Sequence, residues 1–82
     1  MDKKIYTAQQ QVLLGLLREL RQEAELRQQD VADQIEEPQS FVSKYEQGER
    51  RLDILELREI CQVLGVSLAD FAVLLDERLE GE

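Results

Sequence analysis

Residues 39–51, QSFVSKYEQGERR, combine side chains that form directed hydrogen bonds with cationic side chains. The first half of this segment carries four polar residues: Gln39, Ser40, Ser43 and Lys44. A glutamine amide can pair with adenine through two hydrogen bonds, and a lysine can donate to guanine acceptors or to phosphate. Arg50 and Arg51 close the segment and suit contact with phosphates. The available chemistry is that of binding double-stranded DNA, although polar residues on an isolated helix are more often simply solvated.

The protein as a whole is acidic, with 10 basic and 18 acidic residues among 82 and a net charge of -8. Residues 52–82 hold 2 of the basic and 8 of the acidic side chains, whereas residues 39–51 hold 3 basic against 2 acidic ones. Exposed charges more than ~8 Å apart are largely screened from one another at physiological salt. The segment is therefore a local exception to the acidity, and the acid elsewhere is expected to keep nonspecific DNA binding low.

The composition argues against catalysis. The chain has no histidine, so the commonest general base is missing and Cys61 has no histidine to activate it. Neither a glycine-rich phosphate loop nor a cysteine and histidine metal pattern occurs, so no enzyme activity, metal or cofactor is expected. One cysteine cannot form an internal disulfide, and no apolar run approaches the ~20 residues that span a bilayer. We expect a cytoplasmic protein without a membrane segment.

The apolar residues repeat with a helical period along the chain, which predicts a single all-α domain with its core over about 12–79. Five helices are expected, over about 7–24, 28–34, 38–47, 54–64 and 68–81. Capping boxes are expected at Thr7 with Gln10 and at Asp53 with Glu56, and Ser67 can cap the last helix. Further signals are Pro38, which suits the start of a helix, and Gly48 and Gly65, which suit left-handed helix ends.

The same period predicts which residues face the core. They are Leu13, Leu16, Leu17, Leu20 and Ala24 in the first helix; Val31, Ala32 and Ile35 in the second; Ile54, Leu57, Ile60, Cys61 and Leu64 in the fourth; and Leu68, Phe71, Ala72, Leu75 and Leu79 in the fifth. Small Ala32 allows the helices at 28–34 and 38–47 to approach, and Val42 and Tyr45 help to close the angle between them. This spacing fits a helix-turn-helix, although other small helical bundles show similar stripes.

The sequence over about residues 16–71 is similar to a known family. VSKYEQGERR and LGVSL resemble the lambda-repressor-like, Cro-type helix-turn-helix family, also called the XRE family. The resemblance implies a five-helix bundle that binds DNA and regulates transcription. It implies a phosphate contact for Gln28, base-reading positions for Gln39, Ser40 and Lys44, and a further groove contact for Ser43. It also implies an ion pair between Arg21 and Glu46 that sets the angle of the reading helix.

Three positions depart from the family pattern. Arg27 stands where a serine or threonine cap is usual, Glu36 where glycine is common, and Leu52 where proline is frequent. A lost cap costs ~1 kcal/mol unless another group replaces it. Arg27 would add a cation near DNA, and we predict that Arg27, Arg50 and Arg51 join Gln28 as phosphate contacts. Glu36 in a left-handed conformation would cost ~1 kcal/mol relative to glycine.

These features predict a sequence-specific transcriptional regulator. Repression is expected rather than activation, because occupying a promoter requires only binding. The alternative is a protein-interaction module that uses its acidic C-terminal surface. A homodimer through the C-terminal helix is expected because Val73 and Leu74 add to one apolar stripe, and Ile5 and Tyr6 are further unassigned apolar residues. The competing interpretation is a helix that is well buried within one monomer.

Overall fold

The computed structural model describes residues 3–81, with side chains from residue 8 onward. Within that part of the chain the structure is all helical, without a strand. The helices are α1 (Lys3–Glu23), α2 (Gln28–Gln34), α3 (Gln39–Gln47), α4 (Ile54–Leu64) and α5 (Leu68–Gly81). The predicted all-α fold with five helices is therefore confirmed.

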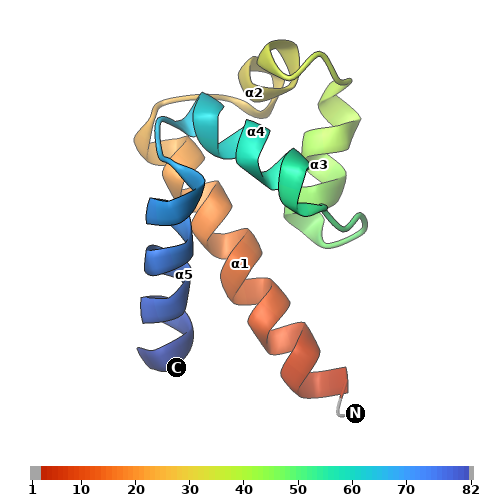
Figure 1. Ribbon diagram of the computed structural model, residues 1–82. Coiled ribbons are helices and arrows are strands. Elements are labelled where there is room, and N and C mark those ends of the chain that lie inside the picture. The colour runs from red at the N-terminus through yellow and green to blue at the C-terminus, as the bar shows by residue number, and fades with distance from the viewer. Residues whose placement is uncertain (1–2, 82) are drawn as a thin grey trace.

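The three shorter helices gather at one end of the molecule, and the two longest run from there toward the opposite end (Figure 1). Helix α2 packs chiefly on α3, while α1 contacts both α3 and α5. The start of α1 and the end of α5 both lie on the side away from α2, but they are apart from each other (Figure 1). The α2–α3 unit is thus held at the end of a scaffold formed by α1, α4 and α5.

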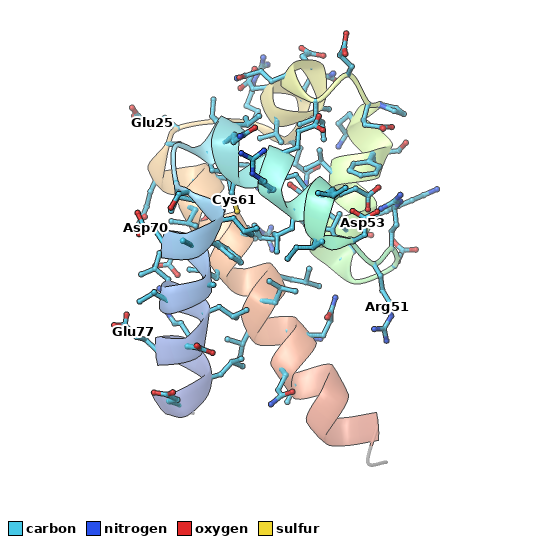
Figure 2. The ribbon with its side chains drawn as sticks, in the orientation of Figure 1. Glu25, Arg51, Asp53, Cys61, Asp70 and Glu77 are labelled. Atoms are coloured by element: carbon cyan, nitrogen blue, oxygen red, sulfur yellow. The ribbon has the colours of Figure 1, made fainter. Side chains whose placement is uncertain are left out.

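The core lies where all five helices meet. Its most completely buried large side chains are Tyr45, Phe71, Leu16, Leu17, Ile60, Val31, Val42 and Cys61. Ala32 is fully buried and Ile35 is 8% exposed, which confirms the predicted packing between α2 and α3. Figure 2 shows Cys61 inside the bundle, and burial raises the pKa of this thiol to about 11. The thiol is therefore neutral near pH 7 and packs as an apolar group.

Three residues predicted to face the core are exposed. Ala24 follows the end of α1, and Ile54, the first residue of α4, is 62% exposed. Helical periodicity gives the direction of an apolar face but not how far along that face the neighbouring helices extend. Ala72 is exposed because α5 lies at the edge of the bundle, where it packs mainly against α1 and α4.

The predicted start of α1 is also wrong. The helix begins at Lys3, so Thr7 lies inside it and does not cap it. Lysine is a good helix former, and nothing in the residues that precede Thr7 stops the helix from continuing toward the N-terminus. The side chains of Ile5, Tyr6 and Thr7 lie outside the described residues, so the expectations for them are not tested.

The later helix ends follow the predicted signals. The Glu56 amide donates to Asp53 Oδ1 at 2.8 Å, and the Asp53 amide donates to Glu56 Oε1 at 3.0 Å, which completes the capping box of α4. Gly48 and Gly65 both have φ of 82°, a left-handed conformation that glycine adopts without strain. The Asp70 amide donates to Ser67 Oγ at 3.0 Å at the start of α5. Local chemistry therefore sets these boundaries.

Helix α2 begins without a capping side chain at Arg27, and Asp30, three residues later, bonds back to the Arg27 backbone instead. The Arg27 amide donates to Asp30 Oδ2 at 2.8 Å, and the Arg27 guanidinium pairs with the same carboxylate. A guanidinium has no acceptor for the first amides of the helix, so Asp30 restores only the reciprocal half of a capping box. The hydrogen bonds from Arg27 lower the pKa of Asp30 to about 2, which keeps it charged at the positive end of α2.

The turn between α2 and α3 carries local backbone strain. Glu36 has φ of 57°, in the left-handed region that a side chain disfavours. We predict that Glu36→Gly raises the free energy of unfolding by up to about 1 kcal/mol. Glu37→Gly is the matched control, because Glu37 has no positive φ and a glycine there adds only unfolded-state freedom. Urea unfolding measures both variants, and an equal loss of stability in the two would contradict the assignment of strain to Glu36.

Candidate nucleic-acid interface

Helix α3 presents the predicted base-reading residues on one exposed surface. Gln39, Ser40 and Lys44 are exposed and Ser43 is half-buried, whereas Val42 and Tyr45 turn into the core. Pro38 precedes the helix, and no acidic residue occupies its first turn. The first turn of α3 therefore combines hydrogen-bonding side chains with the positive end of the helix, and no acidic residue of α3 lies in that turn.

The predicted ion pair between α1 and α3 is present and nearly buried. Arg21 Nε lies 2.7 Å from Glu46 Oε2, and Arg21 Nη2 donates to Glu46 Oε1 at 3.1 Å. The two side chains are 11% and 3% exposed. Arg21 Nη1 also donates to the carbonyl of Leu26, at 2.8 Å, in the connection to α2. One guanidinium thus fixes three segments relative to one another.

A hydrogen-bonded chain leads from this buried pair to the surface of α3. Gln28 Nε2 donates to Glu46 Oε1 at 3.0 Å, and Gln39 Nε2 donates to Gln28 Oε1 at 2.6 Å. The family resemblance implied separate roles for Gln28 and Gln39, and the contact between them was not predicted. A recognisable signal was present, because both are glutamines at the first positions of two packed helices.

The four predicted phosphate contacts differ in their surroundings. Gln28 is half-buried, and its side-chain amide is hydrogen-bonded to both Glu46 and Gln39. The Arg27 side chain is 79% exposed beside Asp30 at the start of α2. Arg50 is bound by Glu56 and lies over the ring of Phe41, whereas Figure 2 shows Arg51 projecting from the loop between α3 and α4.

Acidic residues are unevenly placed around this surface. Glu36 and Glu37 are exposed in the turn that precedes α3, so not every acid is remote from it. Glu49 and Asp53 are exposed in the loop that carries Arg51, and four further exposed acids lie along α5: Asp70, Asp76, Glu77 and Glu80. Figure 2 shows Asp70 and Glu77 on the outer side of α5, across the molecule from Arg51. Folding therefore separates much of the acidic C-terminal region from the loop that carries Arg51.

Comparison with known proteins identifies the family. The model of the helix-turn-helix family matches residues 17–71. The solved structure of an XRE-family like protein from Pseudomonas syringae pv. tomato str. DC3000 is similar, with 40% sequence identity, coverage of 92% of each chain and a TM-score of 0.85. The chain belongs to the XRE family of helix-turn-helix proteins. No curated protein matches it.

Membership of the XRE family makes this protein a DNA-binding regulator of the helix-turn-helix class. The XRE fold is typical of such regulators rather than of enzymes. Across the described residues, no helix is long and apolar enough to cross a membrane.

The buried pair predicts a large stability effect. Glu46→Gln leaves Arg21 without its carboxylate in a nearly buried position, so the free energy of unfolding should fall by ~3 kcal/mol. Glu19→Gln is the matched control, since Glu19 pairs with Arg78 at 2.8 Å but both side chains are more than 40% exposed. That change should cost less than ~1 kcal/mol. If urea unfolding gave equal losses of stability for Glu46→Gln and Glu19→Gln, burial of the pair between Arg21 and Glu46 would not make it the more important one for stability.

Proposed function

We propose that this XRE protein is a sequence-specific repressor that reads the major groove of double-stranded DNA with α3. In a helix-turn-helix the second helix offers residues near its N-terminus to base edges, while the first lies across the backbone. The observation that carries the proposal is the exposed surface of α3, where Gln39 and Ser40 begin the helix and Lys44 lies one turn later. Ser43 would be a further groove contact. Repression follows as the simplest outcome, since an occupied promoter excludes other proteins.

Gln39 is the residue with the most specific expected role. One of its amide hydrogens is engaged by Gln28 Oε1, which leaves Gln39 Oε1 as an acceptor and a second N–H as a donor. This pair of groups matches the donor and acceptor that adenine presents in the major groove. The contact from Gln28 supports a fixed orientation of the amide before DNA arrives, which reduces the entropy lost on binding. Lys44 would donate to guanine acceptors or to phosphate.

Phosphate contacts would set the register of α3 on the duplex. We assign them to Gln28 and Arg27 at the start of α2 and to Arg51 in the loop after α3. Arg50 was expected to join them, but its guanidinium is engaged by Glu56 and by the ring of Phe41. Because each neutralised phosphate releases counterions, these contacts give affinity without sequence preference. The acidic surface of α5 would oppose nonspecific binding to the DNA of the cytoplasm and leave selection to the groove contacts.

A homodimer would supply the affinity that one domain lacks. A single motif with few phosphate contacts should bind near the nonspecific range of ~10⁻⁴ to 10⁻⁶ M. Two copies related by a twofold axis would read a near-palindromic site with their α3 helices about 34 Å apart. Val73 on α5 is 57% exposed, which supports a contact through this helix. The acids on the same helix repel a second α5, so the contact would have to centre on its apolar residues.

Those same acids support a second candidate function. Asp70, Asp76, Glu77 and Glu80 form an exposed anionic surface on α5, which suits docking to a basic protein partner. A protein that binds such a partner through α5 and shows no sequence preference on DNA would favour this alternative. The helix-turn-helix would then serve as a scaffold.

Substitutions in α3 test the reading of DNA. Gln39→Ala and Lys44→Ala should each weaken operator binding by ~1 to 3 kcal/mol and relax the preference at one position. Gln47→Ala is the control on the same helix, since Gln47 is exposed in its last turn. Binding selections on random DNA followed by titration of the selected site measure both effects. Unchanged affinity and preference in the two test variants would remove α3 as the reader.

Sedimentation tests the dimer. The wild-type protein should sediment as a dimer at micromolar concentration or assemble as a pair on its operator, and Val73→Glu should shift it toward monomer by adding charge to the apolar contact. Leu55→Glu is the control, since Leu55 is 73% exposed on α4 rather than on α5. A strict monomer that also fails to bind DNA as a pair would rule the dimer out.

A further inference from the structure

The guanidinium of Arg50 makes several contacts within the protein. Its Nη1 donates to Glu56 Oε1 at 3.1 Å and its Nη2 donates to Glu56 Oε2 at 2.8 Å, so both ends of the guanidinium fork are engaged by one carboxylate. Nη1 also donates to the carbonyl of Arg51 at 2.8 Å. The guanidinium carbon lies 4.4 Å from the centre of the Phe41 ring, at a distance typical of a cation–π contact.

These contacts join three parts of the interface. Phe41 belongs to α3 and packs edge to face against buried Tyr45, with ring centres 5.9 Å apart. Glu56 is the residue whose carboxylate completes the capping box at the start of α4. Arg50 itself lies in the loop between these helices, and the carbonyl that it holds belongs to the next residue of that loop. We call this arrangement of Arg50, Glu56 and Phe41 the loop clamp.

The charge around Arg50 disfavours a contact with phosphate. Its positive charge is already matched by Glu56, and its hydrogen bonds hold the pKa of that carboxyl below the usual range. An incoming phosphate would have to displace Glu56 and would then lie near Asp53, the cap of the same helix. Two carboxylates at the start of α4 make this approach unfavourable.

We propose that Arg50 is a positioning residue of the DNA interface: the loop clamp holds the α3–α4 loop against both helices so that Arg51 meets the DNA backbone from a fixed place. This inference rests on the proposed DNA-binding function. It replaces the expected phosphate contact of Arg50 with an indirect role. Arg50 would raise affinity by keeping the loop in its binding conformation, because apparent affinity scales with the fraction of molecules already in that conformation.

The size of the effect is limited by the strength of the clamp. The Arg50 and Glu56 side chains are 39% and 31% exposed, so solvent screens their attraction in part. Loss of such a pair should reduce operator affinity by about two- to fivefold. Arg50→Lys should retain the charge but restore little, because an ammonium cannot form the two-pronged contact with a carboxylate.

The deciding variant is Glu56→Gln, because the two roles of Arg50 predict opposite signs. The side-chain oxygen of the new glutamine can still accept the Asp53 amide, so the capping box survives while the ion pair is lost. Glu59→Gln is the matched control, since it removes the same charge from α4 at an exposed residue outside the loop clamp. Relative to this control, a released clamp should weaken operator binding. A phosphate-contacting Arg50, freed from its carboxylate, would instead bind DNA more tightly and overturn the inference.

Salt dependence gives a second readout that a general loss of stability would not change. Arg51→Ala should make the slope of log affinity against log salt shallower by about 0.9, the value for one phosphate contact. Arg50→Ala should lower affinity with the wild-type slope, since the loop still makes the same contacts once bound. A slope that becomes shallower in Arg50→Ala to the same extent as in Arg51→Ala would overturn the positioning role.

Amide hydrogen exchange on the free protein separates this inference from the proposed function. Amides of residues 49–52 should exchange several-fold faster in Arg50→Ala and Glu56→Gln than in Glu59→Gln, because only the first two release the clamp. Unchanged exchange would overturn the inference even where DNA binding is intact. A wild-type protein that binds no DNA would overturn the proposed function, and faster exchange in the two clamp variants would then still support the ordering of the loop by Arg50.

Discussion

The ion pair between Arg21 and Glu46 is the contact on which the arrangement of α3 depends. It joins α1 to α3 with little solvent access, and Glu46 uses a remaining acceptor site to hold Gln28 at the start of α2. A buried pair of this kind often adds little to stability compared with apolar residues of the same volume. Its advantage is directional, because hydrogen bonds fix angles that apolar packing leaves freer. The surface of α3 therefore takes its orientation from a polar contact beneath it.

Buried polar side chains are satisfied in the described part of the chain, where no buried side-chain nitrogen or oxygen lacks a hydrogen-bond partner. The cost of burying Arg21 and Glu46 is offset by several bonds shared with neighbours. In the loop after α3, Arg50 is likewise held by a carboxylate but lies nearer to solvent. Arg21 thus holds α3 from the core, and Arg50 holds it from the loop that follows the helix. The predicted base-reading residues Gln39, Ser40 and Lys44 stay exposed.

Much of the fold was predictable from local chemistry. The helical period gave α2 its bounds, and the caps at Asp53, Gly48 and Gly65 fixed helix ends because their hydrogen bonds and φ angles involve only neighbouring residues. The pair between Arg21 and Glu46 was also foreseen, but through resemblance to a family rather than through spacing. The roles of Gln39 and Lys44 on DNA stay predictions, supported by their exposure on α3.

The sequence by itself determined that five amphipathic helices would form and where most of them would end, since periodicity and capping act within a few residues. Only the tertiary structure decided which polar groups meet. Gln28 reaches Gln39 because α2 and α3 pack at a particular angle, and Arg50 finds Glu56 because the loop folds back on α4. The predicted burial of Ile54 failed for the same reason: periodicity orients a side chain, but only the length and position of neighbouring helices determine whether anything covers it.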